Sequence, residues 1–337
     1  MNENVFVGFI CVIIAGVFAG SFSLPMKFTP NWKWQHNWMI YTMWAMLITP
    51  LAFSFYTVPN LISIYLNTDI LVLLKALMLG MAWGVGSVCF GLGLEYLGVA
   101  LGMTIMFGLI ITIGSILPIV LYHPEEMRSS TGLNIILASV ILTTGVVITA
   151  IAGGMKNKKS TTNDDKSTTS ISRFKIGIII AILAGVLGPF LNIAFISGNS
   201  IKQMAIQSGI NLSFSGNAVW PLVLFGGFCI NFGYCAFLIT KNKEWKLFAN
   251  QKSWYWFAMA LSGLLWYFCI FFFGLSSDKL GKLGASIGWA AFQSLAIIIG
   301  NFVGVFTGEW KNTQLRPKLV NLLGIVILIF GIYIIAS

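Results

Sequence analysis

The chain has 337 residues, of which 57% are hydrophobic and only 9% are charged, and its formal net charge is +10. Soluble domains contain about 25% charged residues, so this composition is typical of a membrane protein. The pattern G-x-x-x-x-G-K-[ST] does not occur, and the two histidines, His36 and His123, fall in separate expected loops. These features exclude a nucleotide-driven pump and give no catalytic or metal-binding constellation. We therefore expect neither an enzyme nor a cofactor.

Ten apolar runs follow one another along the chain, and each is close to the roughly 20 residues that a transmembrane helix requires. They lie near residues 5–25, 38–58, 74–94, 100–121, 132–152, 175–196, 218–240, 254–275, 284–306 and 318–336. The five cysteines fall within these runs without a metal-ligand spacing, so no metal site is expected. We predict an all-α membrane protein with ten transmembrane helices.

The basic residues are distributed unevenly between the two sides of the predicted bundle. Most of the 20 lysines and arginines lie in the segments that follow odd-numbered helices. Cytoplasmic loops carry such an excess, so we predict a multi-pass protein of the bacterial inner membrane with both termini in the periplasm. The net charge is then a signal of topology, and we expect the lipid bilayer as a partner and no nucleic acid.

A repeated stretch divides the chain into two similar halves. Residues 80–98, GMAWGVGSVCFGLGLEYLG, align without a gap on residues 263–281, GLLWYFCIFFFGLSSDKLG. The aligned positions share glycines, a tryptophan and an acid: Gly80/Gly263, Trp83/Trp266, Gly91/Gly274, Gly98/Gly281 and Glu95/Asp278. Shorter matches relate the first helix to the sixth and the fifth to the tenth. We infer that five helices are duplicated within the chain.

The two copies are expected to cross the membrane in opposite directions, because partner helices are separated by an odd number of spans. We therefore predict a 5+5 inverted repeat, with the first repeat at 1–152, a cytoplasmic linker at 153–174 and the second repeat at 175–337. The linker is rich in Ser, Thr and Lys and is expected to be disordered. Inverted repeats are typical of secondary transporters, which bind substrate near the midplane between the halves.

Uncharged polar and aromatic side chains within the predicted helices are the candidate substrate-binding residues. They are Trp83, Asn192, Trp220, Asn231, Trp266, Tyr267, Trp289, Gln293 and Asn301. An unpaired amide in hydrocarbon costs about 2–7 kcal/mol, so each amide must bond either a neighbouring helix or a ligand. Amides bond hydroxyl groups and rings cover C–H faces, so this set suits a small neutral sugar. An anionic substrate would require a basic residue in mid-helix, which the sequence does not supply.

Three ionisable residues at helix ends are candidates for ion coupling or gating. Glu95 and Asp278 occupy matching positions of the repeat, and Lys27 follows the first helix. Ionisable groups in membrane helices mark functional sites by default. The alternative is that the two acids are ordinary boundary residues and that Lys27 extends to the membrane surface.

Five stretches together carry a family resemblance: SLPMK (23–27), WGVGSVCFGLGLEYLG (83–98), WPLVLFGGFCINFG (220–233), GLLWYFCIFFFG (263–274) and GEWKN (308–312). Through them the chain resembles the L-rhamnose–proton symporter family, within the drug/metabolite transporter superfamily. The resemblance implies a 5+5 inverted repeat and import of a deoxyhexose, such as rhamnose, with a proton. The positions that match the family pattern include Lys27, Trp83, Trp266, Tyr267, Trp289, Glu309 and Trp310.

The chain departs from this family pattern at two positions. An aspartate four residues before Trp289 is replaced by Ala285, and an arginine just before Tyr-Leu-Gly is replaced by Glu95. Both positions concern groups that proton coupling would use. Two alternatives therefore stay open: a permease or exporter of the same superfamily with different or no ion coupling, and a non-transporting membrane sensor or scaffold.

Overall fold

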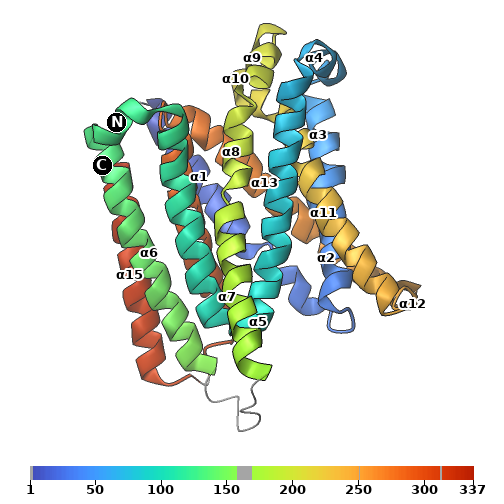
Figure 1. Cartoon of the computed structure of the whole chain (residues 1–337), viewed down its shortest axis with the longest axis vertical. Coiled ribbons are helices and arrows are strands. Elements are labelled where there is room, and N and C mark those ends of the chain that lie inside the picture. The colour runs from blue at the N-terminus through green and yellow to red at the C-terminus, as the bar shows by residue number, and fades with distance from the viewer. Residues whose placement is uncertain (1–2, 158–168, 250, 312) are drawn as a thin grey trace.

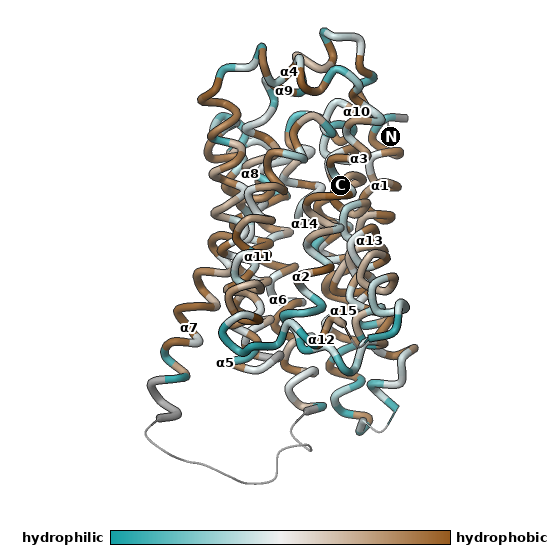
Figure 2. The backbone as a smooth tube through the Cα atoms, turned by 90° about the vertical axis from the view of Figure 1, so that its right-hand side faces the viewer, coloured by the Kyte–Doolittle hydropathy of each residue, from teal (hydrophilic) through white to brown (hydrophobic). Residues whose placement is uncertain are grey.

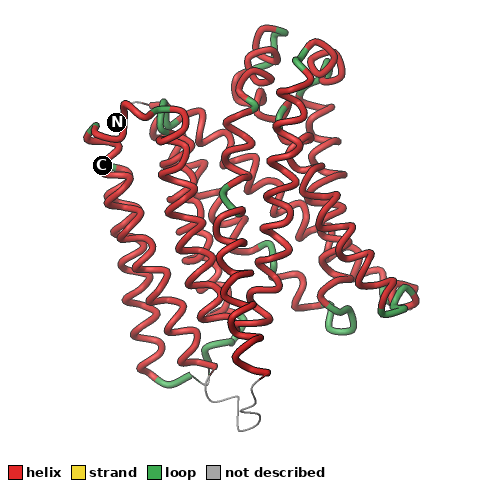
Figure 3. The backbone as a smooth tube through the Cα atoms, in the orientation of Figure 1, coloured by secondary structure: helices red, strands yellow, loops and turns green. Residues whose placement is uncertain are grey.

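The computed structural model describes residues 3–157, 169–249, 251–311 and 313–337. Within these ranges the chain is helical almost throughout and contains no strand (Figure 1, Figure 3). Ten helical segments of the described chain are long and apolar enough to cross a membrane. This confirms the predicted all-α architecture with ten spans.

The elements of the first five spans are α1 (Glu3–Ser21), η1 (Leu24–Phe28), α2 (Trp34–Thr42), η2 (Met43–Ile48), α3 (Thr49–Thr57), α4 (Leu61–Asn67), α5 (Ile70–Tyr122), η3 (Pro124–Arg128) and α6 (Ser130–Asn157). Those of the last five are α7 (Thr169–Leu187), α8 (Phe190–Ser197), α9 (Asn199–Gln207), α10 (Leu212–Ser215), η4 (Gly216–Ala218), α11 (Trp220–Lys241), α12 (Lys246–Ala249), α13 (Ser253–Lys279), α14 (Gly284–Phe306) and α15 (Leu315–Ala336).

Both ends of the chain lie at one end of the bundle, and the adjoining ends of α6 and α7 lie at the opposite end (Figure 1). We call these the terminal face and the linker face. Hydrophilic segments gather near the two faces, while the middle of the bundle is mainly hydrophobic (Figure 2). This distribution is expected where the middle of each helix lies in hydrocarbon and its ends lie in the headgroup region.

Two glycines with positive φ angles lie at or just after the ends of membrane spans. Gly98 has φ 75° and breaks α5 into two spans without an intervening loop. Gly281 has φ 85° and follows the end of α13. Residues with a Cβ rarely adopt this conformation, so glycine is required where the chain reverses this sharply. The proposed repeat pairs these two positions.

Glycines of each half lie closely against the other half. The contacts form reciprocal pairs: Gly16 of α1 against Leu295 of α14, Gly185 of α7 against Leu109 of α5, Gly80 of α5 against Val223 of α11, and Gly263 of α13 against Trp44 of η2. A Cβ on Gly80 would lie 2.0 Å from the carbonyl oxygen of Val223. Small residues allow helix backbones to approach this closely in lipid. The helices before and after the linker therefore pack closely against each other at these four glycines.

The predicted linker is helical at both of its ends. α6 continues to Asn157 and α7 begins at Thr169, whereas residues 158–168, the middle of the predicted disordered linker, lie outside the described residues. Backbone hydrogen bonds carry each helix beyond its apolar run, so a count of apolar residues ends α6 too early and begins α7 too late. The division into domains at 153–174 stays a prediction.

Candidate functional site

A cavity of about 520 Å³ lies between the two halves and extends to the linker face. Its wall is formed by α1, both spans of α5, α6, α14 and the segment after α14. The aromatic lining residues are Phe22, Phe90, Phe107 and Trp310, and the polar ones are Ser23, Thr149, Lys156, Asn301 and Glu309. This volume is in the usual range for small-molecule sites, which combine apolar walls with a few polar groups.

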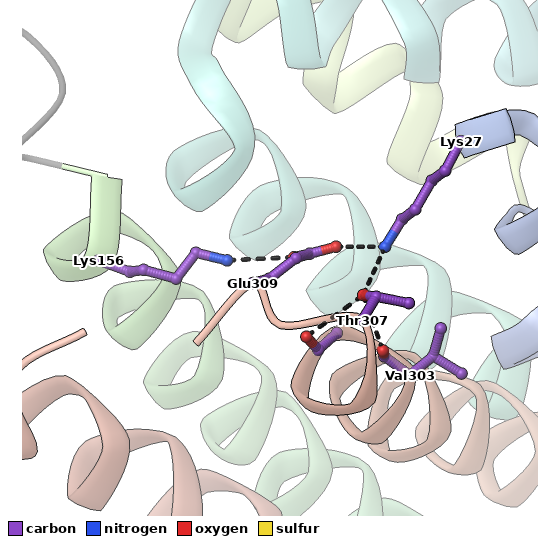
Figure 4. A network of polar contacts seen from close by, with 6 residues as sticks. Lys27, Lys156, Val303, Thr307 and Glu309 are labelled. Carbon is purple, nitrogen blue, oxygen red and sulfur yellow. Dashed lines mark hydrogen bonds and ion pairs between the residues drawn. The ribbon is translucent and has the colours of Figure 1, made fainter. Parts of the chain in front are cut away.

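Charged residues from three elements meet at the mouth of the cavity (Figure 4). Lys27 donates hydrogen bonds to the Glu309 carboxylate and, over 3.0 Å, to Thr307 Oγ1. Lys156 Nζ lies 3.1 Å from the other oxygen of Glu309. The hydrogen bond from Lys27, supported by Lys156, lowers the pKa of Glu309 below its ordinary value. The Glu309 carboxylate, which follows α14, thus joins η1 and α6 of the first half to the second half of the chain.

The end of α14 positions this carboxylate. Gly308, with φ 80°, ends the helical turn, and the Glu309 amide donates a 2.9 Å hydrogen bond to the carbonyl of Gly304. Gly304 has no side chain, so Glu309 and Trp310 lie directly against the last turn of the helix. Lys156 lies 5.0 Å from the centre of the Trp310 ring. The GEWKN stretch therefore places an acid and an aromatic ring together at the mouth.

Two of the predicted amides lie at or near the cavity. Asn301 lines it and donates a 2.9 Å hydrogen bond to the Ile297 carbonyl of its own helix, which leaves its oxygen free to accept. Gln293 lies one helical turn from Ala296 and Ile297, which line the cavity, and is partly exposed. Within the described chain Gln293 makes no hydrogen bond. Both amides can therefore still bond a ligand.

The other two predicted amides bond neighbouring helices instead. Asn192 donates to the carbonyls of Gly114, at 3.0 Å, and Ala285, at 3.2 Å. Asn231 accepts from Trp38 Nε1 at 2.9 Å and from Ser87 Oγ at 3.1 Å. Both side chains are fully buried. Helix packing thus pairs the nitrogens of both amides and the oxygen of Asn231, whereas Asn192 Oδ1 is buried without a hydrogen-bond partner in the described residues. That these amides bind substrate stays a prediction.

The five predicted aromatic residues are packed rather than facing the cavity. Trp83 stacks on Trp266 with ring centroids 5.5 Å apart, and Trp220 stacks on Phe195 at 4.4 Å. Trp289 donates a 3.0 Å hydrogen bond to the Ile110 carbonyl. Tyr267 is completely buried. None of these five rings is among the residues that line the cavity in this state, and all except the partly buried Trp266 are enclosed by packing between helices.

The Trp83–Trp266 stack is nevertheless connected to the cavity through two further rings. Phe22, which lines the cavity, lies 5.5 Å from Tyr41, and Tyr41 lies 6.3 Å from Trp266, both measured between ring centroids. Trp83 precedes the cavity residue Phe90 on α5 and lies nearer to the terminal face. The stack therefore lies on the terminal-face side of the cavity.

The two acids matched by the repeat have different surroundings. Glu95 is 66% exposed and lies 3.7 Å from Arg173. Asp278 pairs with Lys202, and these side chains are only 15% and 9% exposed. The Lys202 ammonium also lies 4.8 Å from the centre of the Phe195 ring. Glu95 is thus largely exposed, whereas Asp278 belongs to a largely buried ion pair near the terminal face; a coupling or gating role for either stays a prediction.

Sequence reasoning did not select Lys156 or Lys202. Each is a single lysine near a helix end, and nothing in its local sequence identifies the acidic partner. Glu309 and Trp310 were identified only through the family resemblance, by the GEWKN stretch.

Comparison with known proteins gives a match over the full length of the chain. The model of a family described as L-rhamnose-proton symport protein (RhaT) matches residues 1–337. A relative from Mannheimia succiniciproducens, named L-rhamnose-proton symporter, is 25% identical over 340 residues, covering 98% of this chain and 97% of the relative. Relatives of the same name from Shigella dysenteriae and Escherichia coli are 26% identical over 337 residues, covering 98% of this chain and 96% of each relative.

Proposed function

We propose that this chain, which belongs to the L-rhamnose-proton symport protein (RhaT) family, imports a neutral deoxyhexose, L-rhamnose, together with a proton. The observation that carries the proposal is the family match over residues 1–337. The relatives named L-rhamnose-proton symporter also align over 98% of the chain. Ten apolar helices and the family make this a multi-pass membrane protein, of the bacterial inner membrane, and not an enzyme.

The orientation that we propose places the linker face in the cytoplasm and both termini in the periplasm. Lys27, Lys156 and Arg173 belong to the linker face, and cytoplasmic segments are enriched in basic residues. In this orientation the cavity opens towards the cytoplasm. The conformation described here then corresponds to the inward-open state of an alternating-access cycle.

We further propose that the two halves form a 5+5 inverted repeat and that transport rocks one half against the other. The reciprocal glycine contacts between the halves and the paired positive-φ glycines support this arrangement. Inverted repeats provide two equivalent conformations of one bundle, in which the halves exchange roles. The substrate site remains between them in both.

The sugar-binding site in this state is the cavity itself. Asn301, Thr149 and Ser23 offer amide and hydroxyl groups to sugar hydroxyls, and Phe90 and Phe107 offer ring faces to sugar C–H groups. Trp83, Trp266 and Gln293 lie on the terminal-face side of the cavity, where a sugar entering from that face would meet them first. Asn192, Trp220, Asn231, Tyr267 and Trp289 serve to hold the helices that form the site.

The ion pair of Asp278 and Lys202 is the candidate for proton coupling. Protonation of Asp278 would remove its charge and release Lys202, so one proton from the periplasmic side would change the contact between α13 and α9. Glu309 is less suited to this step, because Lys27 and Lys156 hold its pKa low. We assign the Lys27–Glu309–Lys156 group to gating at the cytoplasmic mouth.

Uptake of labelled L-rhamnose into proteoliposomes tests this function. Accumulation that requires an inward proton gradient and is blocked by excess unlabelled rhamnose supports the proposal. Uptake that ignores the proton gradient, or that follows sodium, identifies instead a permease or a differently coupled transporter. The absence of uptake for rhamnose and for a panel of pentoses and hexoses would contradict sugar transport and favour the sensor or scaffold.

A further inference from the structure

A second hollow lies on the outer side of α14 and α15 and shares a wall with the cavity. This groove has a volume of about 480 Å³ and is lined by residues of both helices and of the segment that connects them. Asn301 and Trp310 line the groove as well as the cavity. The groove therefore lies at the linker face, separated from the proposed sugar site by these side chains.

The floor of the groove is apolar and open on one side. Phe302, Val305 and Leu322 line it and are 47%, 52% and 56% exposed. In a membrane-spanning bundle, apolar side chains exposed on the outer surface of a helix face the lipid chains. The floor is thus accessible from the bilayer and chemically suited to an acyl chain.

The end of the groove at the linker face is basic. Lys311, in the connection between the helices, and Lys318, at the start of α15, both line it. Neither lysine takes part in a salt bridge within the described chain. Lys27 and Lys156 on the same face, by contrast, share the Glu309 carboxylate. The groove therefore presents two unneutralised cations at the depth of the lipid headgroups.

A buried amide provides an independent sign of a polar ligand. Asn321 lines the groove one turn after Lys318, is only 6% exposed, and its oxygen has no hydrogen-bond partner in the described residues. Its nitrogen makes no hydrogen bond there either. A buried polar group without a partner is costly. An amide nitrogen can donate to a phosphate or ester oxygen.

We propose that this groove binds an anionic phospholipid. Its phosphate lies between Lys311 and Lys318, its glycerol ester region lies at Asn321, and an acyl chain follows the apolar floor. Basic pockets between transmembrane helices on the cytoplasmic side suit anionic headgroups. A free phosphate would leave the apolar floor unused, and a second copy of the chain would bring its own basic linker face against these lysines.

The test is lipid retention by the purified full-length chain in neutral detergent, measured by native mass spectrometry and by titration. The probes are phosphatidylglycerol, phosphatidylcholine and inorganic phosphate. Wild type is expected to retain phosphatidylglycerol in preference to phosphatidylcholine. The double variant Lys311→Gln/Lys318→Gln is expected to bind phosphatidylglycerol about 30-fold more weakly, from the usual contribution of a lysine near an anionic membrane surface.

Two further variants separate lipid binding from general effects of charge. Lys243→Gln/Lys246→Gln removes two exposed lysines elsewhere on the same face and is expected to retain the lipid like wild type. Leu322→Trp fills the apolar floor without changing the charge and is expected to reduce retention. Wild-type binding of phosphatidylglycerol by both Lys311→Gln/Lys318→Gln and Leu322→Trp would overturn the proposal. Full displacement of phosphatidylglycerol by inorganic phosphate would also overturn it. So would a lipid-free dimer that Leu322→Trp dissociates, because the groove would then hold a second copy of the chain.

Discussion

Trp83 of α5 and Trp266 of α13 stack on each other with ring centroids 5.5 Å apart and planes inclined by 19°. The proposed repeat pairs these two residues, so each half of the molecule supplies one face of the same contact. Tyr41 lies edge-on to Trp266, at 6.3 Å between ring centroids, and links the stack to the cavity wall. We infer that the stack closes the route between the cavity and the terminal face.

Replacing one ring of this stack should impair both stability and transport. Trp266→Ala removes the stacking partner of Trp83 and leaves a void, since neighbouring helices relax only partly around a deleted ring. We expect a lower thermal unfolding temperature and gradient-driven uptake reduced roughly tenfold or more. Trp266→Phe keeps an aromatic face and should retain most of both. Wild-type uptake by Trp266→Ala would contradict a closing role for the stack.

The Glu309 network should give the protein a pH-dependent contribution to stability. Because the network lowers the pKa of Glu309, its contribution is present above the ordinary glutamate pKa of about 4.3 and is lost as the pH falls through the lower pKa of the folded state. Glu309→Gln should therefore melt at a lower temperature than wild type at neutral pH. The difference should disappear in acid. If the melting temperatures of wild type and Glu309→Gln differ by the same amount at neutral and at acidic pH, the ionised Glu309 carboxylate is not the source of the difference.

Neutralising Asp278 should uncouple sugar movement from the proton gradient. Asp278→Asn keeps the size of the side chain but cannot be protonated reversibly, so we expect gradient-driven uptake to be lost and sugar exchange across the membrane to persist. Glu95→Gln is the matched control, because Glu95 occupies the corresponding repeat position but is 66% exposed. If Glu95→Gln loses coupling and Asp278→Asn keeps it, then Glu95 and not Asp278 is the proton-coupling residue.

Removing the cavity amide should weaken sugar binding. Asn301→Leu has a similar volume but cannot bond a sugar hydroxyl, and the loss of about one hydrogen bond should raise KM roughly fivefold. Thr144→Val is a suitable control, because Thr144 is exposed and bonds only the Val140 carbonyl of its own helix. A fall in kcat with an unchanged KM would instead place Asn301 in the conformational change.

The ten spans could be predicted because hydrophobic runs of membrane length are a property of the sequence alone. The sequence also predicts the repeat, since Trp83/Trp266 and Gly98/Gly281 stand in one register, and the 5+5 arrangement stays a prediction. The site could be predicted only in part. Whether an amide such as Asn192 bonds a helix or faces a cavity depends on how distant segments pack. The partners of Lys156 and Lys202 come from other helices, which no local pattern identifies.

The resemblance described in the sequence analysis implies an aspartate at the position of Ala285 and an arginine at that of Glu95, so it leaves open which groups of this chain handle protons. The structure offers Asp278 and Lys202 as a buried pair near the terminal face. Its position differs from that of Ala285, whose carbonyl accepts a hydrogen bond from Asn192. A proton-binding group can thus be supplied by a different helix from the one that the resemblance indicates.

Current recorded from proteoliposomes on a solid-supported membrane tests proton-coupled sugar import most directly. A neutral sugar that enters with a proton carries positive charge, so addition of L-rhamnose without a pre-formed gradient should produce an inward positive current that Asp278→Asn abolishes. Rhamnose that enters the vesicles without any current would contradict the account, because the sugar would then be moving without a proton.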